Sequence, residues 1–526
     1  MSTDTGSAPR TKDTATAVEK PYPSAAAGWF LVVMLTIAYI FSFVDRYILG
    51  LLVEPIKAEF ALTDIQIGWL LAAFTIIYGF VGVFMGWLID RGKRIWIVSV
   101  GIALWSAATV ATGMAKNFVQ LFIARMSVGV GEATLSPATF SMIGDSFPPE
   151  KRGKPIAFYS SALPIGAGLA SLLSAGIIAW AASGGTQSLP LFGELSPWRF
   201  TLIVVGLPGI FLALFFLLMK EPARRPAPQS VASARTYGET VGWYFRNFGL
   251  RTILIWGAFA FILVLIGASV VQPFFGGIAF LVTLAVWFYI VTNPSKRPTP
   301  HAQGEVSGSG FFDALFYLRD NFWLYAGVIL IVCCMTAIAY SQGLLPSTFE
   351  RTWGWSPQKY ALINGIALLI IGPINMLIFG SLSDKMTSRG IADAPLKILY
   401  LGFFIMVPSG VIPFFMPTPE LAFAMLCINT VGIGIVSAIG VTSLLAITPS
   451  QIRGQVIALY YLGISWFGSL GPIATGYLSN LVFGEENIRY AVASVPVLFA
   501  IIPLALMPMT LRLYRAQLAK IGEVKA

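Results

Sequence analysis

Residues 148–159 read PPEKRGKPIAFY, and residues 449–460 read PSQIRGQVIALY. Both stretches follow the pattern P-x3-R-G-x2-I-A-x-Y, 301 residues apart. A second pair of segments repeats with a similar spacing, GWLIDR at 86–91 and GSLSDK at 380–385. The chain is therefore predicted to contain two related halves in parallel repeat, and such a duplication implies a substrate site near the middle of their interface.

The composition indicates a multi-pass membrane protein. Of its 526 residues, 56% are hydrophobic and 11% are charged, whereas about 25% are charged in a typical soluble protein. Residues 1–27 are polar and lack the apolar segment of a signal peptide, so we expect a disordered cytosolic tail. The net charge of +10 would suggest a nucleic-acid partner in a soluble protein. Here the positive-inside rule explains it, and no nucleic-acid partner is expected.

Apolar runs of spanning length form two sets of six. They fall near 28–53, 66–89, 95–114, 118–143, 155–181 and 198–219, and near 322–349, 358–381, 394–416, 420–447, 452–481 and 488–511. A further run, 252–292, is broken at Gln272-Pro273 and Gly276-Gly277 and is predicted to form two helices joined by a turn. The expected fold is an all-α membrane protein with two six-helix halves and an inserted two-helix hairpin, about fourteen transmembrane helices in all.

These runs also define the predicted domains. They are a cytosolic N-terminal tail (1–27), the N-terminal half (28–220), a cytosolic linker (221–251), the inserted hairpin (252–292), a second cytosolic linker (293–321), the C-terminal half (322–512) and a cytosolic C-terminal tail (513–526). Within the second linker, residues 311–319 (FFDALFYLR) are expected to form either an interfacial amphipathic helix or a plain tether.

The distribution of Lys and Arg predicts the orientation. With both termini in the cytosol, 26 of the 34 basic residues fall in cytosolic segments and 6 in outer segments, while Arg46 and Arg125 lie within spans. This asymmetry favours a cell (inner) membrane protein with both termini cytoplasmic. The same orientation requires the chain to return to the cytosolic side after the two helices of the inserted hairpin.

Two charges lie inside the fourth span, in the stretch RMSVGVGEATLSP (125–137). Arg125 and Glu132 are seven residues apart, nearly two helical turns, so both project from one helix face. Gly129 and Gly131 between them would allow a neighbouring helix to approach closely. A charge at the centre of a membrane helix costs about 2.5–3.5 kcal/mol. The pair is therefore either functional or a structural ion pair that fixes helix packing.

The first span carries Asp45-Arg46-Tyr47 near its outer end. At 1.5 Å per residue, Asp45 lies roughly 26 Å from the cytosolic start of the span. We infer that Asp45, Arg46, Arg125 and Glu132 converge on one polar pocket. Burial favours the protonated form of a carboxyl group, whereas a nearby arginine favours the ionised form. A substrate that engages the arginine would therefore change proton affinity, which is the physical basis of proton coupling.

The second half has no equivalent charges, because Leu426 and Ile433 stand at the positions that correspond to Arg125 and Glu132. Its candidate polar residues inside the spans are Tyr340, Ser341, Gln342, Asn364, Asn375 and Asn429. A cavity charged on one wall and mostly apolar on the other suits an amphipathic substrate with an anionic or zwitterionic head. Asn and Ser in membrane helices also serve in packing alone.

No cofactor, metal or catalytic site is expected. His301 is the one histidine, and the three cysteines, Cys333, Cys334 and Cys427, fall in apolar runs, where they are most simply packing residues. No nucleophile–base pair stands out, so an enzyme is not expected.

These features resemble the major facilitator superfamily across residues 28–511. Residues 86–94 look like its signature loop, with a shorter second copy at 380–389. Three features resemble the spinster-like branch, namely Asp45-Arg46-Tyr47, Arg125-x3-Gly129-x-Gly131-Glu132-Ala133 and Asp145-Ser-Phe-Pro148. The inserted pair departs from the usual twelve-helix pattern of the superfamily.

The resemblance implies roles for individual residues. Asp45 and Glu132 would be protonation sites, and Arg46 and Arg125 their partners or contacts of the substrate head. A gate network at the inward side is expected at Gly86, Asp90, Arg91, Arg94, Asp145, Gly380 and Asp384. The substrate-binding candidates are Arg46, Tyr47, Tyr340, Gln342, Asn364 and Asn429.

The expected function is secondary active transport by alternating access, with proton coupling and a lipid-like or anionic small molecule as substrate. Protons and membrane lipids are the other expected partners, and the chain is expected to be a monomer. The alternatives are an organic-acid/proton symporter, a uniporter, and a membrane ligand sensor that does not transport.

Overall fold

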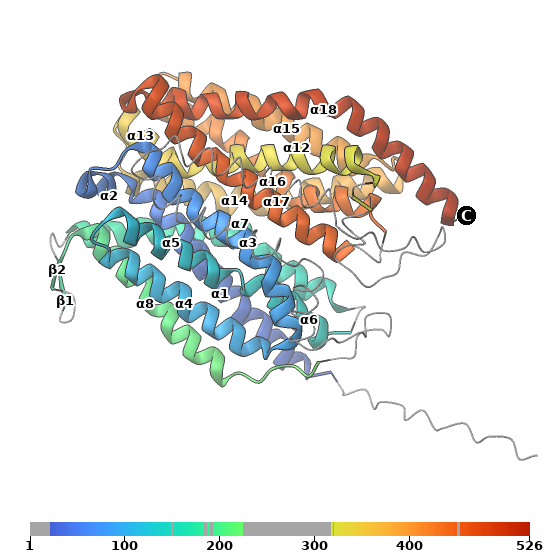
Figure 1. The fold of residues 1–526 in the computed structure, drawn as a ribbon, viewed down its shortest axis with the longest axis horizontal. Helices are drawn as coiled ribbons and strands as arrows, with labels where there is room; N and C mark the ends of the chain where they lie inside the picture. Colours follow the sequence, from blue (N-terminus) through green and yellow to red (C-terminus); the bar gives the residue numbers. More distant parts are fainter. Residues whose placement is uncertain are drawn as a thin grey trace, which may run out of the picture.

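The structure is a computed structural model. It describes residues 22–148, 151–183, 187–189, 193–224, 317–318, 320–449 and 453–525. The inserted pair 252–292, the two linkers beyond residue 224 and most of the 311–319 segment lie outside the described residues. The described part is almost entirely helical and forms two bundles packed side by side, which confirms the predicted fold class (Figure 1).

Six spans make up the N-terminal half. They are α1 (Ala25–Leu51), α3 (Asp64–Arg91), α4 (Arg94–Met114), α5 (Phe118–Glu132) continued by α6 (Leu135–Ser146), α7 (Gly153–Ser183) and α8 (Pro197–Leu218). A short helix, α2 (Val53–Phe60), and a two-stranded hairpin, β1 (Gln187–Leu189) with β2 (Gly193–Leu195), lie at one end of this half. The strands pair antiparallel with Ser188 opposite Glu194.

Six spans also make up the C-terminal half. They are α12 (Phe322–Ser341) continued by η3 (Gln342–Leu344) and α13 (Leu345–Trp353), α14 (Pro357–Ser388), α15 (Ala394–Val411) with η4 (Ile412–Phe415), α16 (Pro419–Ile447), α17 (Arg453–Leu478) with the π-helical segment η5 (Ser479–Phe483), and α18 (Ile488–Lys525). A single 3-10 turn, η6 (Glu485–Asn487), precedes α18. In the described part, 11 helical segments are long and apolar enough to cross a membrane.

Three spans predicted as continuous helices are interrupted. The fourth span breaks between Glu132 and Leu135, where the Ala133 N–H donates to the Gly129 and Gly131 carbonyls. The seventh span breaks at η3, and the eleventh ends in a π-helical turn. The break in the fourth span makes Glu132 the last residue of α5. Residues 513–525, predicted as a tail, continue α18 as helix.

The repeated motif performs the same local task in both halves. The Arg152 side chain donates to the Phe147 carbonyl (2.9 Å), and the Arg453 side chain donates to the Thr448 carbonyl (3.0 Å). Phe147 and Thr448 are the C-caps of α6 and α16. Each arginine therefore satisfies a carbonyl that the end of a helix leaves without a partner, which explains why arginine recurs at this position.

The two halves are joined at one end of the molecule and separate at the other. One hydrophobic core, at the end with α2 and α13, contains residues of both halves, from Phe43 to Val205 and from Leu344 to Ala493. Toward α6 and the C-terminus, two further cores each belong to one half. We call these the joined end and the separated end, at the left and right of Figure 1.

Contacts along α3 show where the halves part. A Cβ on Gly68 would lie 2.5 Å from the Pro472 carbonyl oxygen of α17, and one on Gly79 would lie 2.4 Å from the Ser465 Cβ. At Gly82 and Gly86, further along α3, a Cβ would have no neighbour within 4 Å in the part of the chain that the structure describes. The close contact between α3 and α17 therefore ends before α3 does.

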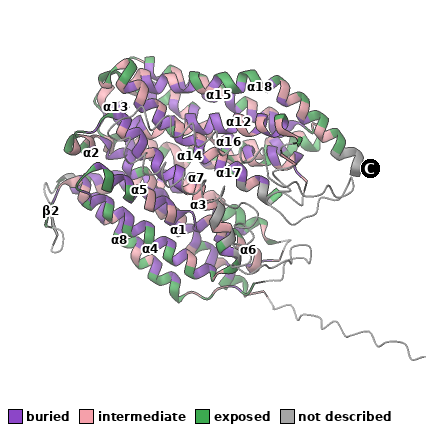
Figure 2. Ribbon diagram, in the orientation of Figure 1, coloured by how far each residue is buried: buried purple, intermediate pink, exposed green. Residues whose placement is uncertain are grey.

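The outward faces of the bundle are apolar. Exposed residues appear along α8 and α18 at the outer edges of the molecule (Figure 2), and they include Phe211 at 70% and Leu218 at 85% exposed. Large exposed apolar surfaces are unusual in a soluble monomer and are expected where helices face lipid.

Candidate functional site

Glu132 and Arg46 form a buried ion pair within the N-terminal half. The Arg46 Nε lies 2.6 Å from Glu132 Oε2, and the side chain of Glu132 is 1% exposed. The Ser42 hydroxyl donates to the same oxygen at 2.7 Å. Because Ser42 and Arg46 are one turn apart on α1, both reach one carboxylate.

Arg125 contacts α1 through the backbone of Asp45. Its Nη1 donates to the backbone carbonyl of Asp45 at 3.1 Å rather than to the carboxylate of that residue. Asp45 and Arg125 are each 3% exposed. Among the described residues, Asp45 Oδ1, Arg125 Nε and Glu132 Oε1 have no hydrogen-bond partner. The cluster therefore holds two carboxylate oxygens and one N–H group inside the protein that are available for further hydrogen bonds.

Aromatic rings separate the two guanidinium groups. The Phe74 ring centroid lies 4.8 Å from the Arg46 guanidinium carbon and 5.5 Å from that of Arg125. Tyr78 and Phe43 also face Arg46, at 5.0 and 5.3 Å. Cation–π contacts of this kind stabilise a charge away from water. Sequence reasoning missed Phe74 and Ser42. The i, i+4 spacing to Arg46 was a usable signal for Ser42, but none pointed to Phe74.

Glycine packing positions the cluster. A Cβ on Gly129 would lie 2.6 Å from the Phe74 carbonyl oxygen of α3, and one on Gly131 would lie 2.6 Å from the Gly101 carbonyl oxygen of α4. The close helix approach predicted for these two glycines is therefore confirmed. One turn beyond Arg46, a Cβ on Gly50 would lie 2.9 Å from the Gly343 carbonyl oxygen of the other half. The cluster thus borders the contact between the halves.

The candidates in the C-terminal half are more dispersed. Gln342 donates to the Asn429 side chain, which in turn donates to the Met406 carbonyl (2.7 Å). These amides stabilise their own half, and their predicted substrate role stays a prediction. Tyr340 is 41% exposed and lies near enough to Arg46 to interact with it electrostatically. Tyr47 is 37% exposed, and Asn364 is partly buried on α14.

Arg94, in the predicted gate motif, is the centre of a network at the separated end. It is fully buried and pairs with Asp145 and with Glu221 (2.9 Å). It also donates to Ser141 (2.9 Å) and to the Pro222 carbonyl (2.9 Å). All these partners belong to the N-terminal half or its immediate extension, so the network holds one half together. The side chain of Asp90 is not described, and Arg91 is exposed.

The signature glycines Gly86 and Gly380 have open space beside them in the described part of the structure. Among the described residues, no atom lies within 4 Å of a Cβ built on Gly86 or on Gly380, and Asp384 is exposed. Both glycines lie where the halves have parted, and their predicted role in a gate stays a prediction.

A second ionic network, not foreseen from the sequence, bridges the halves at the joined end. Asp64 at the start of α3 is fully buried and accepts two hydrogen bonds from Arg351 of α13, at 2.8 and 3.0 Å. Lys57 binds both Asp64 (2.6 Å) and Glu485 (2.5 Å). Glu485 also accepts from the Asp64 backbone N–H at 3.0 Å and so caps α3 from the opposite half.

Two six-helix halves, apolar outer faces and a buried charge cluster at the contact between the halves define a multi-pass membrane protein of the transporter class. The family model described as Major Facilitator Superfamily matches residues 35–275 and 328–523, most of the chain. The chain belongs to this superfamily, whose members are transporters and not enzymes.

The named relatives of this chain carry different functional descriptions. An "MFS-type efflux pump" of Mycolicibacterium smegmatis is 25% identical over 86% of this chain and 84% of its own length. "Protein spinster" of Drosophila melanogaster is 29% identical over 42% of this chain and 34% of its own. A "Probable L-galactonate transporter" of Escherichia coli is 29% identical over 36% of this chain and 38% of its own. For the last two, the chain matches little more than a third of the relative.

The fold matches that of a bacterial homologue of spinster. That structure, described as inward-facing and unoccupied, superposes with a TM-score of 0.66 at 20% identity, covering 94% of this chain and 99% of the other. The similarity to the spinster-like branch, predicted from three short motifs, is thereby confirmed at the level of the fold and of the relatives found.

Proposed function

We propose that this chain is a proton-coupled secondary active transporter that works by alternating access in the cell (inner) membrane, with both termini cytoplasmic. Its substrate is an amphipathic or anionic small molecule. The observation that carries the proposal is the buried cluster of Asp45, Arg46, Arg125 and Glu132, in which one oxygen of each carboxylate has no hydrogen-bond partner among the described residues.

The ion pair suggests how protons and substrate would be coupled. Glu132 is the one carboxylate paired with Arg46, at 2.6 Å, among the described residues. A proton on Glu132 would remove its charge and leave the Arg46 guanidinium free to bind an anionic head group. Release of the substrate would restore the pair and favour loss of the proton. Breaking a buried pair by removing one partner typically costs 3–5 kcal/mol, so each state needs either the carboxylate or the substrate beside Arg46.

The arrangement of the halves supports alternating access. The halves share a core and an ionic network at the joined end, while each has its own core at the separated end. Rocking of the halves about the central cluster would exchange which end is closed. By the predicted orientation, the separated end faces the cytosol.

Two substrate classes have support, and one assay separates them. The resemblance to the spinster-like branch, which the named relatives support, is the ground for a lipid-like molecule, and this is our main proposal. The relatives named galactonate transporters favour a small organic acid, held by Arg46 and Arg125 as carboxylate clamps. A uniporter and a ligand sensor that does not transport remain the other candidates from the sequence.

The test uses purified protein in liposomes that contain a pH-sensitive dye. Lysolipids, sphingoid compounds and D-galactonate are added in turn. We expect one class to produce a substrate-dependent pH change that Glu132→Gln abolishes, because an amide cannot exchange a proton. Glu420→Gln, which changes an exposed acid at the start of α16, is the matched control and should keep the signal.

Other outcomes would contradict the proposal. Flux of labelled substrate that ignores the pH gradient would identify a uniporter, and ligand-induced thermal stabilisation without flux would identify a sensor. Wild-type coupling in Glu132→Gln would remove Glu132 from the mechanism. Asp45→Asn, tested in the same way, determines whether the second carboxyl group is also required.

A further inference from the structure

A cavity of about 390 Å³ lies between the start of α12 and the last third of α18. It is lined by Trp323 of α12 and by Pro508, Met509, Arg512 and Leu513 of α18. Its volume is within the range of small-molecule sites. We call it the α12–α18 groove.

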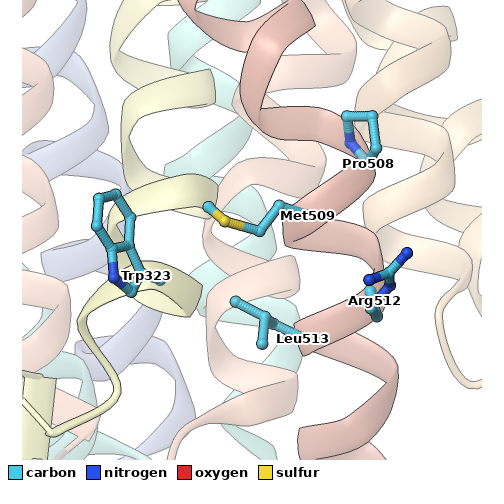
Figure 3. Close-up of a pocket in the computed structure, with 5 residues that line it drawn as sticks. All are labelled: Trp323, Pro508, Met509, Arg512 and Leu513. Carbon is cyan, nitrogen blue, oxygen red and sulfur yellow. The ribbon is translucent and has the colours of Figure 1, made fainter.

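The groove has an apolar floor with a cation beside it. Figure 3 shows Met509 and Leu513 projecting from α18 toward Trp323, while Arg512 extends from the side of α18 away from Trp323. Trp323 is 61% exposed. Arg512 is exposed as well and has no ion pair within the described part of the chain, whereas Arg515, one turn further, pairs with Asp393 at 2.6 Å.

The groove lies at the level of a membrane interface. The apolar run of α18 ends directly before Arg512, and Trp323 is the second residue of α12. Tryptophan and arginine are the residues enriched where helices leave the hydrocarbon layer. This is the separated end, which the distribution of Lys and Arg predicts to be cytosolic, and the cytosolic leaflet carries the anionic lipids.

The groove is remote from the proposed transport route. α18 packs on α12, α15 and α17 of its own half and runs along the outer edge of the molecule (Figure 1). The charge cluster of Asp45, Arg46, Arg125 and Glu132 belongs entirely to the other half. A molecule in the groove would therefore meet the protein from the lipid phase.

We propose that the α12–α18 groove binds an anionic phospholipid. An acyl chain lies along Trp323, Met509 and Leu513, and the phosphate group pairs with Arg512. Charge complementarity carries this assignment, because an unpaired arginine at the interface attracts an anionic head group and an apolar floor accepts a lipid chain. The proposal does not depend on the identity of the transported substrate.

The test compares lipid retention by native mass spectrometry of the full chain in detergent. Phosphatidylglycerol and phosphatidylcholine are offered at equal concentrations. We expect wild-type protein to retain phosphatidylglycerol preferentially and Arg512→Gln to lose roughly fivefold of that preference, the effect of about one basic residue at a membrane surface. Arg489→Gln, at the opposite end of α18, is the matched control and should leave the preference unchanged.

A second variant tests the apolar floor. Leu513→Trp fills the groove and should reduce retention of both lipids while Arg512 is still present. Thermal unfolding of each variant shows whether it is folded. Equal retention by wild type and Arg512→Gln would overturn the proposal. Loss of the preference on addition of millimolar glycerol phosphate would assign the site to a free phosphate anion and would also overturn it.

Discussion

The two ends of this molecule use the same kinds of residues for opposite purposes. At the joined end, Asp64 and Arg351 pair across the halves, and the surrounding core contains side chains of both. At the separated end, Arg94 and Asp145 pair within one half, and Asp393 and Arg515 pair within the other. Buried ion pairs therefore do not by themselves indicate a gate. What matters is whether the pair crosses the contact between the halves.

The largest effect is expected from Asp64→Asn. This change weakens the bonds to Arg351 and Lys57, both directed at a fully buried carboxylate. Removing one partner of a buried ion pair costs about 3–5 kcal/mol of stability. This loss should open the joined end. Spin labels at Lys116 and Glu420, one on each half, would report a longer and broader distance distribution in a background without the native cysteines.

The matched control for this change is Glu59→Gln. Glu59 also lies at the joined end, but its partner Arg199 (2.6 Å) belongs to the same half. The distance between the labels should stay at its wild-type value in this variant. An unchanged distance in Asp64→Asn, or an equal opening in both variants, would show that the network does not hold the halves together.

An intermediate effect is expected from Gly168→Leu. A Cβ at Gly168 would lie 2.6 Å from the Leu369 Cγ and 2.9 Å from the Gly365 carbonyl oxygen, both in the other half. Overpacking of this kind costs about 1–3 kcal/mol. Gly380→Leu adds the same side chain to a helix but meets no described atom within 4 Å of its Cβ, so it should be tolerated. Thermal unfolding in detergent measures the difference, and equal losses would mean that the halves also touch at Gly380.

The smallest effect is expected at Asp393, in the turn before α15. Burial raises the pKa of this carboxyl group, but hydrogen bonds from Lys397 and Arg515 outweigh it, and the pKa lies below its usual value. Its contribution to stability is therefore complete above about pH 4 and is lost as the pH falls through the lowered pKa of the folded state. Because both partners are largely exposed, that contribution is about 0.5–1 kcal/mol.

Asp393→Asn tests this expectation. The variant should be less stable than wild type at pH 7, and the difference should shrink as the pH falls below about 4. The distance between the labels should not change, since the pair lies within one half. A change in that distance would show that the ion pairs of the separated end also control the contact between the halves.

Local patterns in the sequence were sufficient to predict where the helices lie. The span predicted at 420–447 is Pro419–Ile447, and the one predicted at 66–89 is Asp64–Arg91. The break after Glu132 was missed, because residues 118–143 are mostly small or apolar and contain no proline before Pro137. The β hairpin was missed as well, since three-residue strands carry too few positions for a period to appear.

The four buried charges were found from the sequence, but their pairing was not. Arg46 pairs with Glu132, whereas Arg125 donates to the backbone carbonyl of Asp45 and faces the Phe74 ring. Which atoms meet depends on the rotation and axial position of α1 relative to α5. Those are set by close packing of Gly129 and Gly131 against α3 and α4, and no local pattern encodes such contacts.

By itself, the sequence determined that this chain is a membrane protein of two related halves with charges inside its spans. Hydropathy and repeats are properties of short segments, and they remain the same in every conformation of the transport cycle. Only the tertiary structure decided which end is joined, because that depends on contacts such as the one between Asp64 and Arg351, 287 residues apart. Such contacts can form and break while every helix stays intact, since a helix satisfies its own backbone hydrogen bonds.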